Sequence, residues 1–181
     1  MPLPDGFVLG AATSAYQIEG AWNVDGKAPS IWDTFTSLPG KTEGGVSGRD
    51  GVDHYRRFAE DIRHMQAIGL DSYRFSLSWA RLPPEGTGPV NQAGVDFYDR
   101  LIDALLTAGI QPNVTLYHWD LPQALQDRGG WPNREVIDWF EEYAALAFDR
   151  YGDRVPLWAT LNEPIAAAGA PVYVPASTPK D

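Results

Sequence analysis

The side chains that could carry out chemistry stand directly after apolar runs of the sequence. Glu163 is the clearest, because it lies between Asn162 and Pro164 just beyond the apolar run 155–161. Apolar surroundings raise the pKa of a carboxyl group, which suits it to act as a general acid. Asn162 can hydrogen-bond a hydroxyl group of a bound molecule. The alternative, that both side chains only cap the turn at Pro164, stays open.

His118 and Trp119 follow the apolar run 112–117 in the same way. An imidazole can donate or accept a hydrogen bond near neutral pH, so His118 could bind a polar ligand. A structural hydrogen bond beneath a loop is the equally supported alternative. The other two histidines, His54 and His64, fall on an expected helix, where structural or solvent-facing positions are expected.

Gln17 follows the apolar run 7–12, and its amide could bind two hydroxyl groups of a sugar or could simply belong to a loop.

Arg74 differs from these residues, because it lies inside the apolar run 72–77. A charge in such a run is costly unless it is paired. Arg74 therefore predicts a buried carboxylate partner, either in a structural ion pair or as an acid that Arg74 positions in a site.

Aromatic residues make up 12% of the 181-residue chain, with seven Trp, eight Tyr and seven Phe. Some of them follow Gly, Asn or His in polar segments rather than standing in periodic apolar stripes. Aromatic side chains in loops are typical of sites for ligands with flat apolar faces and polar edges, such as sugars. Ordinary core packing is an alternative of equal weight.

The composition excludes several classes of function. The chain has no Cys, which rules out disulfides, thiolate metal sites and cysteine nucleophiles, and its three His are too few for most histidine-rich metal sites. We therefore expect no metal and no cofactor. A net charge of −10 repels phosphate backbones, so nucleic acid is not an expected partner. The sequence has no long apolar run and no signal-like start, which predicts no membrane contact and a cytoplasmic location.

Three helices are predicted over 53–68, 93–108 and 134–151, because apolar residues recur there at intervals of three and four. Strands are predicted over the four apolar runs: 7–12, 72–77, 112–117 and 155–161. Strands that alternate with helices indicate a parallel sheet whose strands all end at the same edge. The polar clusters should meet at that edge, where parallel α/β folds carry their active sites.

A weak internal repeat supports this arrangement. The glycine that ends each helix precedes a cluster residue by ten positions: Gly69 and Trp79, Gly109 and Trp119, Gly152 and Asn162. Four strands and three helices make about half of a (β/α)₈ TIM barrel, which needs eight strands. We therefore expect a truncated α/β barrel over 1–164, with strand order 1-2-3-4 and helices on one face. A divergent tail rich in Ala and Pro is expected over 165–181.

Four stretches of the sequence, in this order and at this spacing, carry a resemblance to a known family. They are FVLGAATSAYQIEG (7–20), YRFSLSW (73–79), VTLYHWDLP (114–122) and TLNEP (160–164). Together they resemble glycoside hydrolase family 1, the β-glucosidases and their relatives. The resemblance covers the chain from Phe7 to Pro164.

This resemblance implies a (β/α)₈ barrel that cleaves β-glycosides with retention of configuration. It implies that Glu163 is the general acid/base and that Asn162 holds the 2-hydroxyl group of the sugar. Gln17, His118 and Trp119 would bind other hydroxyl groups of that sugar. Arg74 would lie beneath the catalytic nucleophile and support its ionised form.

The chain also departs from the family. The nucleophile of the family is a second glutamate in a Thr-Glu-Asn-Gly-like motif, and no such motif occurs here. Glu19 and Asp120 are the local carboxylates that could replace it, although both belong to stretches that look structural in the family. The sequence therefore leaves three readings: the acid/base half of a β-glycosidase, a non-catalytic half-barrel remnant, and one subunit of a split glycosidase.

These readings lead to three structural expectations. Gln17, Trp79, His118, Asn162 and Glu163 should cluster where the strands end. Because the nucleophile is missing, Arg74 should be partly unpaired or open to solvent. The open sheet edges predict self-association or binding of a complementary C-terminal half-barrel, besides the β-glycoside or small sugar.

Overall fold

The computed structural model describes residues 3–169 and contains one parallel sheet of four strands. The strands pair in the order β1-β2-β3-β4, as predicted, and every pairing is parallel. Their bounds are β1 (Gly10–Ala12), β2 (Ser72–Ser76), β3 (Gln111–Tyr117) and β4 (Leu157–Leu161). The predicted truncated α/β barrel is confirmed.

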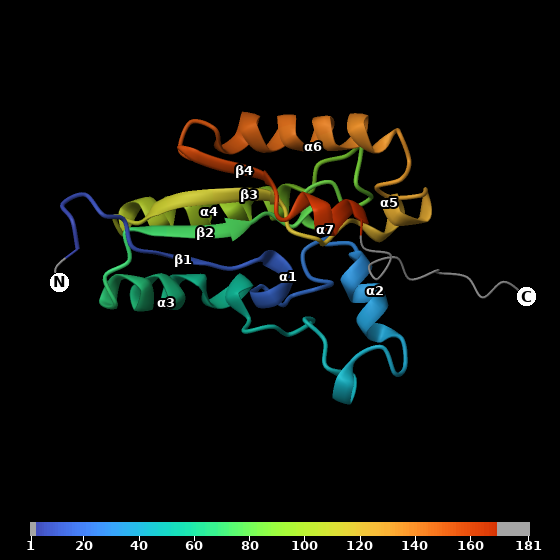
Figure 1. Ribbon diagram of the computed structural model, residues 1–181, viewed down its shortest axis with the longest axis horizontal. Coiled ribbons are helices and arrows are strands. Elements are labelled where there is room, and N and C mark those ends of the chain that lie inside the picture. Colours follow the sequence, from blue (N-terminus) through green and yellow to red (C-terminus); the bar gives the residue numbers. More distant parts are fainter. Residues whose placement is uncertain (1–2, 170–181) are drawn as a thin grey trace, which may run out of the picture.

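Three long helices connect the successive strands. They are α3 (His54–Ala67), α4 (Gln92–Thr107) and α6 (Val136–Tyr151), each close to its predicted position. Figure 1 shows α3 beside β1, α4 behind β2 and β3, and α6 along β4, so that the three helices lie around the outside of the sheet. Gly69 and Gly109 follow α3 and α4 with φ of 76° and 74°, a left-handed conformation that ends a helix at little cost for glycine.

The prediction of three helices was incomplete, because shorter helices occupy the loops that follow the strands. They are α1 (Ala15–Ile18), α2 (Ile31–Ser37), α5 (Gln123–Asp127), α7 (Pro164–Gly169) and the 3₁₀ turns η1 (Glu43–Gly45) and η2 (Trp79–Arg81). Segments of three to seven residues are too short to show an apolar stripe. The helix α7 takes up the start of the predicted tail, and the rest of the tail, 170–181, lies outside the described residues.

Alternation along the central strands separates two faces of the sheet. Tyr73 and Phe75 of β2 and Val114 and Leu116 of β3 are buried against the helices and form the centre of the core. Arg74, which pairs in register with Asn113, points to the opposite, concave face. That face is only partly covered. Within 3–169, no helix has the length and apolar character needed to cross a membrane.

Candidate active site

The predicted catalytic and sugar-binding residues all follow strands at the same edge of the sheet. Gln17 lies in α1 after β1, the His118–Trp119 pair follows β3, and the Asn162–Glu163 pair follows β4. Figure 1 shows both α1 and α7 at this end of the strands. Because β3 and β4 are neighbours, the last two pairs are the ones that the fold brings together.

Arg74 connects three strands at this edge. Its Nε donates a hydrogen bond of 2.8 Å to Thr115 Oγ1 on β3, and its Nη2 donates one of 3.0 Å to Asn162 Oδ1 beyond β4. The buried carboxylate partner that we expected for Arg74 is absent from residues 3–169, so that expectation stays a prediction. The guanidinium is only half-buried, and neutral oxygens together with solvent access on the concave face satisfy it. The later expectation, that Arg74 is partly unpaired or open to solvent, agrees with its half-buried position.

Trp119 and Asn162 hold the ends of β3 and β4 together. The indole Nε1 of Trp119 donates a hydrogen bond of 2.9 Å to the carbonyl oxygen of Asn162. The amide nitrogen of Asn162 in turn donates one of 2.9 Å to the carbonyl of Tyr117. Asn162 therefore has both its backbone and its side-chain oxygen fixed.

His118 precedes Trp119 in the chain, and its imidazole is neutral. Burial, and then the positive charge of Arg74, lower the pKa of His118 below its ordinary value. Its Nδ1 is buried and has no hydrogen-bond partner among the described residues. His118 therefore keeps a ring nitrogen with no partner inside this part of the chain.

Glu163 is the most exposed acid of the candidate site. Its side chain is exposed, and its carboxylate makes no hydrogen bond or ion pair within 3–169. The backbone of Glu163 has φ of 48° and that of Trp119 has φ of 76°, in the left-handed region that such residues rarely adopt. Strained backbone of this kind is common at functional sites. A glutamate or a tryptophan in the sequence does not indicate such a conformation.

Trp79 and Gln17 do not lie with the other site residues as expected. Trp79 is fully buried, stacks on Tyr143 with ring centroids 4.6 Å apart, and donates from Nε1 to the carbonyl of Gly86. The prediction that it lies in the polar cluster was wrong, because η2 turns the chain into the helix layer directly after β2. Gln17 is exposed and lies two strands away from β3.

A buried ion pair behind the strand ends was not predicted. Glu19 Oε2 accepts hydrogen bonds of 3.1 and 3.0 Å from Nε and Nη2 of Arg81, and Glu19 Oε1 accepts one of 2.6 Å from the hydroxyl of Tyr98. The guanidinium of Arg81 also lies 4.2 Å from the ring centroid of Tyr55. The one signal in the sequence was an arginine in the otherwise apolar stretch after β2.

Asp120 is also buried and differs from Glu19 in having no cationic partner of its own. Burial raises the pKa of Asp120 to about 8; the positive charge of Lys27 opposes the rise, and the negative charge of Glu19 adds to it. Asp120 is therefore mostly protonated at neutral pH. Neither it nor Glu19 presents a free carboxylate at the edge of the sheet.

The part of the chain that the structure describes contains no cluster of three or more His, Cys, Asp or Glu side chains arranged to hold a metal ion. The functional groups of the candidate site are an amide, an imidazole, an indole and a single carboxylate. This set can bind hydroxyl groups and transfer one proton.

Comparisons with known proteins agree with these features. Residues 1–180 match the family described as Glycosyl hydrolase family 1. The chain is 57% identical over 161 residues to β-glucosidase A of Acetivibrio thermocellus, and the match covers 89% of this chain and 36% of that protein. It is 56% identical to the aryl-phospho-β-D-glucosidase of Bacillus subtilis, with 88% and 34% covered.

Solved structures give the same result. The β-glucosidase of Thermotoga maritima in complex with castanospermine superimposes with a TM-score of 0.89 at 55% identity. That match covers 91% of this chain and 38% of the other. The chain thus spans little more than a third of the length of the relatives that it matches.

Proposed function

Because the chain belongs to glycosyl hydrolase family 1, we propose that it forms the acid/base half of a β-glycosidase active site. The observation that carries this proposal is the hydrogen-bonded set of Arg74, Asn162 and Trp119 beside the free carboxylate of Glu163. It supplies a fixed binding group and a proton donor at the edge of the sheet where parallel α/β enzymes place their chemistry.

Asn162 is oriented for sugar binding. Its Oδ1 already accepts a hydrogen bond from Arg74, so its Nδ2 is left as the donor toward a ligand. A hydroxyl oxygen of a sugar can accept that hydrogen bond. His118 would bind the same sugar from β3, and Gln17 from the far side at β1. Trp119, whose single N–H already donates to Asn162, would contact the sugar with the face of its ring.

Glu163 would act as the general acid and then as the general base. In the first step its carboxyl proton passes to the glycosidic oxygen as that bond breaks, while a second carboxylate attacks the anomeric carbon. In the second step Glu163 takes a proton from a water molecule, which displaces the enzyme carboxylate. Retention of configuration requires the two carboxyl groups to stand about 5–5.5 Å apart on opposite sides of the sugar.

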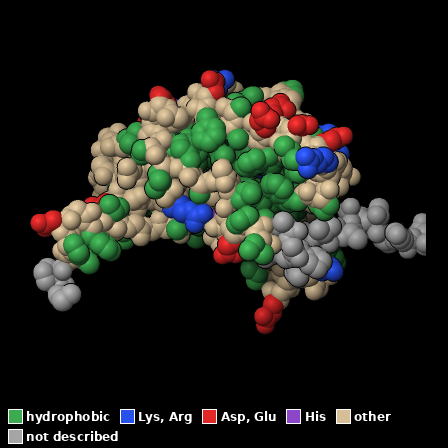
Figure 2. Space-filling view, turned by 45° about the horizontal axis from the view of Figure 1, so that its top comes forward, with side chains coloured by type: hydrophobic (Ala, Val, Ile, Leu, Met, Phe, Trp, Pro, Cys, Tyr) green, Lys and Arg blue, Asp and Glu red, His purple; other side chains and the backbone are tan. Residues whose placement is uncertain are grey.

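The second carboxylate would come from outside the described residues. Glu19 is committed to Arg81 and Tyr98, and Asp120 is buried and mostly protonated at neutral pH. We therefore propose that a complementary half-barrel supplies the nucleophile. Apolar residues available for such a contact are exposed near β4: Leu157, Ile165, Ile137 and Phe148. Figure 2 shows hydrophobic side chains gathered on the face turned toward the viewer.

A non-catalytic sugar-binding role is the second candidate. It is favoured by one observation, namely that hydroxyl-binding side chains are present while Glu163 is the only free carboxylate of the candidate site among residues 3–169. The two proposals share the same sugar contacts. They differ in whether the chain can be completed to an active enzyme.

Complementation separates the two candidates. The 181-residue chain should not hydrolyse an aryl β-glucoside alone. Mixed with a fragment of Thermotoga maritima β-glucosidase that lacks the matching N-terminal part, it should regain hydrolysis. In that mixture Glu163→Gln should lower kcat/KM for substrates with poor leaving groups by about 10²–10⁴-fold, the usual contribution of a general acid.

Glu141→Gln, an exposed glutamate on α6, is the matched control and should leave the restored rate unchanged. Sugar binding without any restored hydrolysis would favour the non-catalytic role. Turnover by the 181-residue chain alone, lost on Glu163→Gln, would overturn the need for a second half and would point to Glu19 or Asp120.

A further inference from the structure

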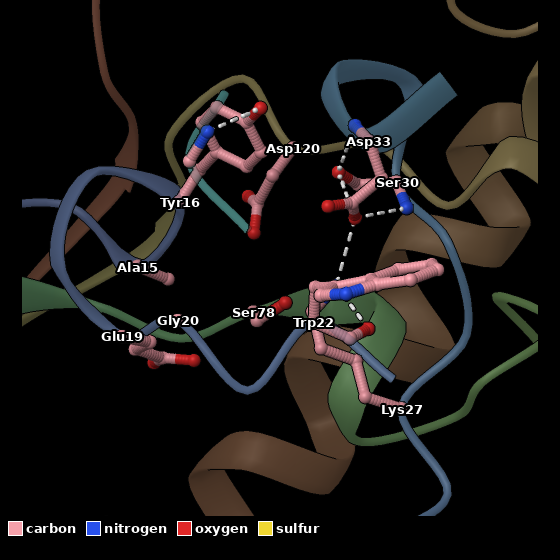
Figure 3. Close-up of a pocket in the computed structure, with 11 residues that line it drawn as sticks. Ala15, Tyr16, Glu19, Gly20, Trp22, Lys27, Ser30, Asp33, Ser78 and Asp120 are labelled. Atoms are coloured by element: carbon pink, nitrogen blue, oxygen red, sulfur yellow. Dashed lines mark hydrogen bonds and ion pairs between the residues drawn. The ribbon is translucent and has the colours of Figure 1, made fainter. Parts of the chain in front are cut away.

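A small polar cavity lies between the loops that follow β1, β2 and β3. Its volume is about 10 Å³, and Lys27, Asp33, Ser78 and Asp120 are among the residues that line it. Figure 3 shows the side chains of Asp120 and Ser78 directed toward one space, which Asp33 borders from the other side. A cavity of this size holds about one water molecule if two to four polar groups face it.

Three oxygen atoms around this cavity are buried and unpartnered. Asp33 Oδ1, Ser78 Oγ and Asp120 Oδ1 make no hydrogen bond of good geometry among residues 3–169, although Ser78 lies close enough to Asp120 to oppose the rise that burial causes in the pKa of that carboxyl group. The three residues are only 2%, 1% and 2% exposed, so bulk solvent does not reach them. An unsatisfied buried polar group lowers the stability of the fold, which makes three of them around one space unusual.

The hydrogen-bonding needs of the three atoms are complementary to those of a single water molecule. Asp33 Oδ1 is a carboxylate oxygen that accepts, the protonated Asp120 carboxyl group can still accept through its carbonyl oxygen, and the Ser78 hydroxyl group can donate. A water molecule can donate to Asp33 and Asp120 and accept from Ser78 at the same time. A cation is a poorer occupant, because Lys27 already brings a positive charge within 2.9 Å of Asp33 Oδ2.

The cavity borders the candidate site through the backbone. Asp120 directly follows Trp119, whose φ of 76° is strained and whose indole fixes Asn162. A contact that holds Asp120 therefore also constrains the His118–Trp119 turn. The Lys27–Asp33 ion pair lies on the opposite side of the cavity and joins the segment before α2 to the first turn of α2.

We propose that this cavity binds one water molecule, held by Asp33, Ser78 and Asp120, and that this water makes Asp120 a positioning residue for the His118–Trp119 turn. The inference goes beyond the proposed function and does not depend on it. Its readouts are an occupied cavity and the position of Trp119, and neither requires hydrolysis.

The first test is a high-resolution crystal structure of the 181-residue chain. We expect one density peak within hydrogen-bond distance, about 2.7–3.0 Å, of all three oxygens. A direct hydrogen bond between Ser78 and Asp120 with no peak would overturn the proposal. A peak at about 2.3–2.6 Å from the oxygens, the range of a hard cation such as Ca²⁺, would also overturn it.

The second test measures the position of Trp119 by the ¹H–¹⁵N signal of its indole, assigned with Trp119→Phe. Ser78→Ala removes the donor to the water and should shift this signal. Ser72→Ala is the control, because the Ser72 hydroxyl donates a hydrogen bond to the carbonyl of Gln111 at the start of β3, and neither residue lines the cavity. The Trp119 signal should stay in place in that variant.

Equal shifts in both variants, or no shift in either, would show that the cavity does not position the turn. If Ser78→Ala does not fold, Ser78→Cys serves the same purpose, because a thiol keeps an atom in place but is a weak donor. The Trp119 signal should then shift in Ser78→Cys and not in Ser72→Ala.

Discussion

Two glutamates follow strands at the same edge of the sheet and have opposite surroundings. Glu19, beyond β1, is 4% exposed, and its carboxylate accepts three hydrogen bonds from Arg81 and Tyr98. Glu163, beyond β4, is exposed and has a carboxylate without a partner in the described part of the chain. A carboxylate that accepts three buried hydrogen bonds holds loops together, whereas one that is free can exchange a proton with a ligand.

The difference follows from what each strand end packs against. The loop after β1 lies under the loops after β2 and β3, and burial there requires each charge to have a partner. The end of β4 has no following strand among residues 3–169, so its side chains stay open. The same residue type therefore serves stability at one end of the sheet and is available for catalysis at the other.

The largest expected effect is on stability and uses the same substitution at both glutamates. Glu19→Gln leaves the Arg81 guanidinium buried without its counter-charge and should destabilise the fold by about 3–5 kcal/mol. Glu163→Gln should change stability by no more than about 0.5 kcal/mol, as is usual for surface substitutions. Thermal unfolding of the two variants, side by side, measures the contrast. Equal losses of stability in the two variants would contradict the difference between the two carboxylates.

Tyr98→Phe should have the next largest effect. It removes the hydroxyl that donates to Glu19 and that accepts a hydrogen bond of 2.7 Å from the amide of Ser78, and both groups are buried. We expect a loss of about 1–3 kcal/mol in urea unfolding. Tyr55→Phe is the control, because the Tyr55 hydroxyl bonds Asp25, which is exposed and can turn to water. A larger loss in the control would contradict the proposed role of burial.

The third prediction concerns pH. The pKa of Asp120 is raised from its ordinary 3.8 to about 8 in the folded state. Its contribution to stability is therefore complete below about pH 4 and is lost as the pH rises through 8. Lys27, Glu19, Tyr117 and Tyr143 are the ionisable groups that interact with it.

The melting temperature should therefore fall between pH 6 and pH 9. In Asp120→Asn, which cannot ionise, most of that fall should disappear. A fall of the same size in the variant would assign the pH dependence to other groups.

The smallest expected effect is on His118. Burial and the charge of Arg74 lower the pKa of His118, so an NMR titration of its ring should give a midpoint below that of a histidine in a peptide. Arg74→Met should move the midpoint upward, because the nearby positive charge is removed. Arg63→Met, on the exposed side of α3, should leave it unchanged. An unchanged midpoint in Arg74→Met would show that burial alone causes the shift.

The elements of the fold were largely predictable because their signals are local. The apolar spacing of α3, α4 and α6 and the runs that form the four strands can be recognised within windows of a few residues. The glycines after α3 and α4 mark their ends for the same reason. Trp79 shows the limit, since nothing near it in the sequence indicates that η2 turns its ring onto Tyr143.

The candidate site was predictable in position but only partly in detail. His118, Trp119, Asn162 and Glu163 all follow strands, as their place after apolar runs indicated. Arg74 was expected to pair with a carboxylate, and its partners are instead Thr115 and Asn162. The identity of a partner depends on which strands lie side by side and on how far the site is open to water.

The sequence by itself determined the order of strands and helices, the family, and the set of polar residues at the strand ends. Periodicity and motifs depend only on residues that are close together in the sequence. Only the tertiary structure decided which carboxylate is free. Glu19 meets Arg81 and Tyr98 across 62 and 79 residues of chain, and these long-range contacts turn it into a structural group. Burial and pairing are properties of the packed molecule, so the contrast between Glu19 and Glu163 exists only in three dimensions.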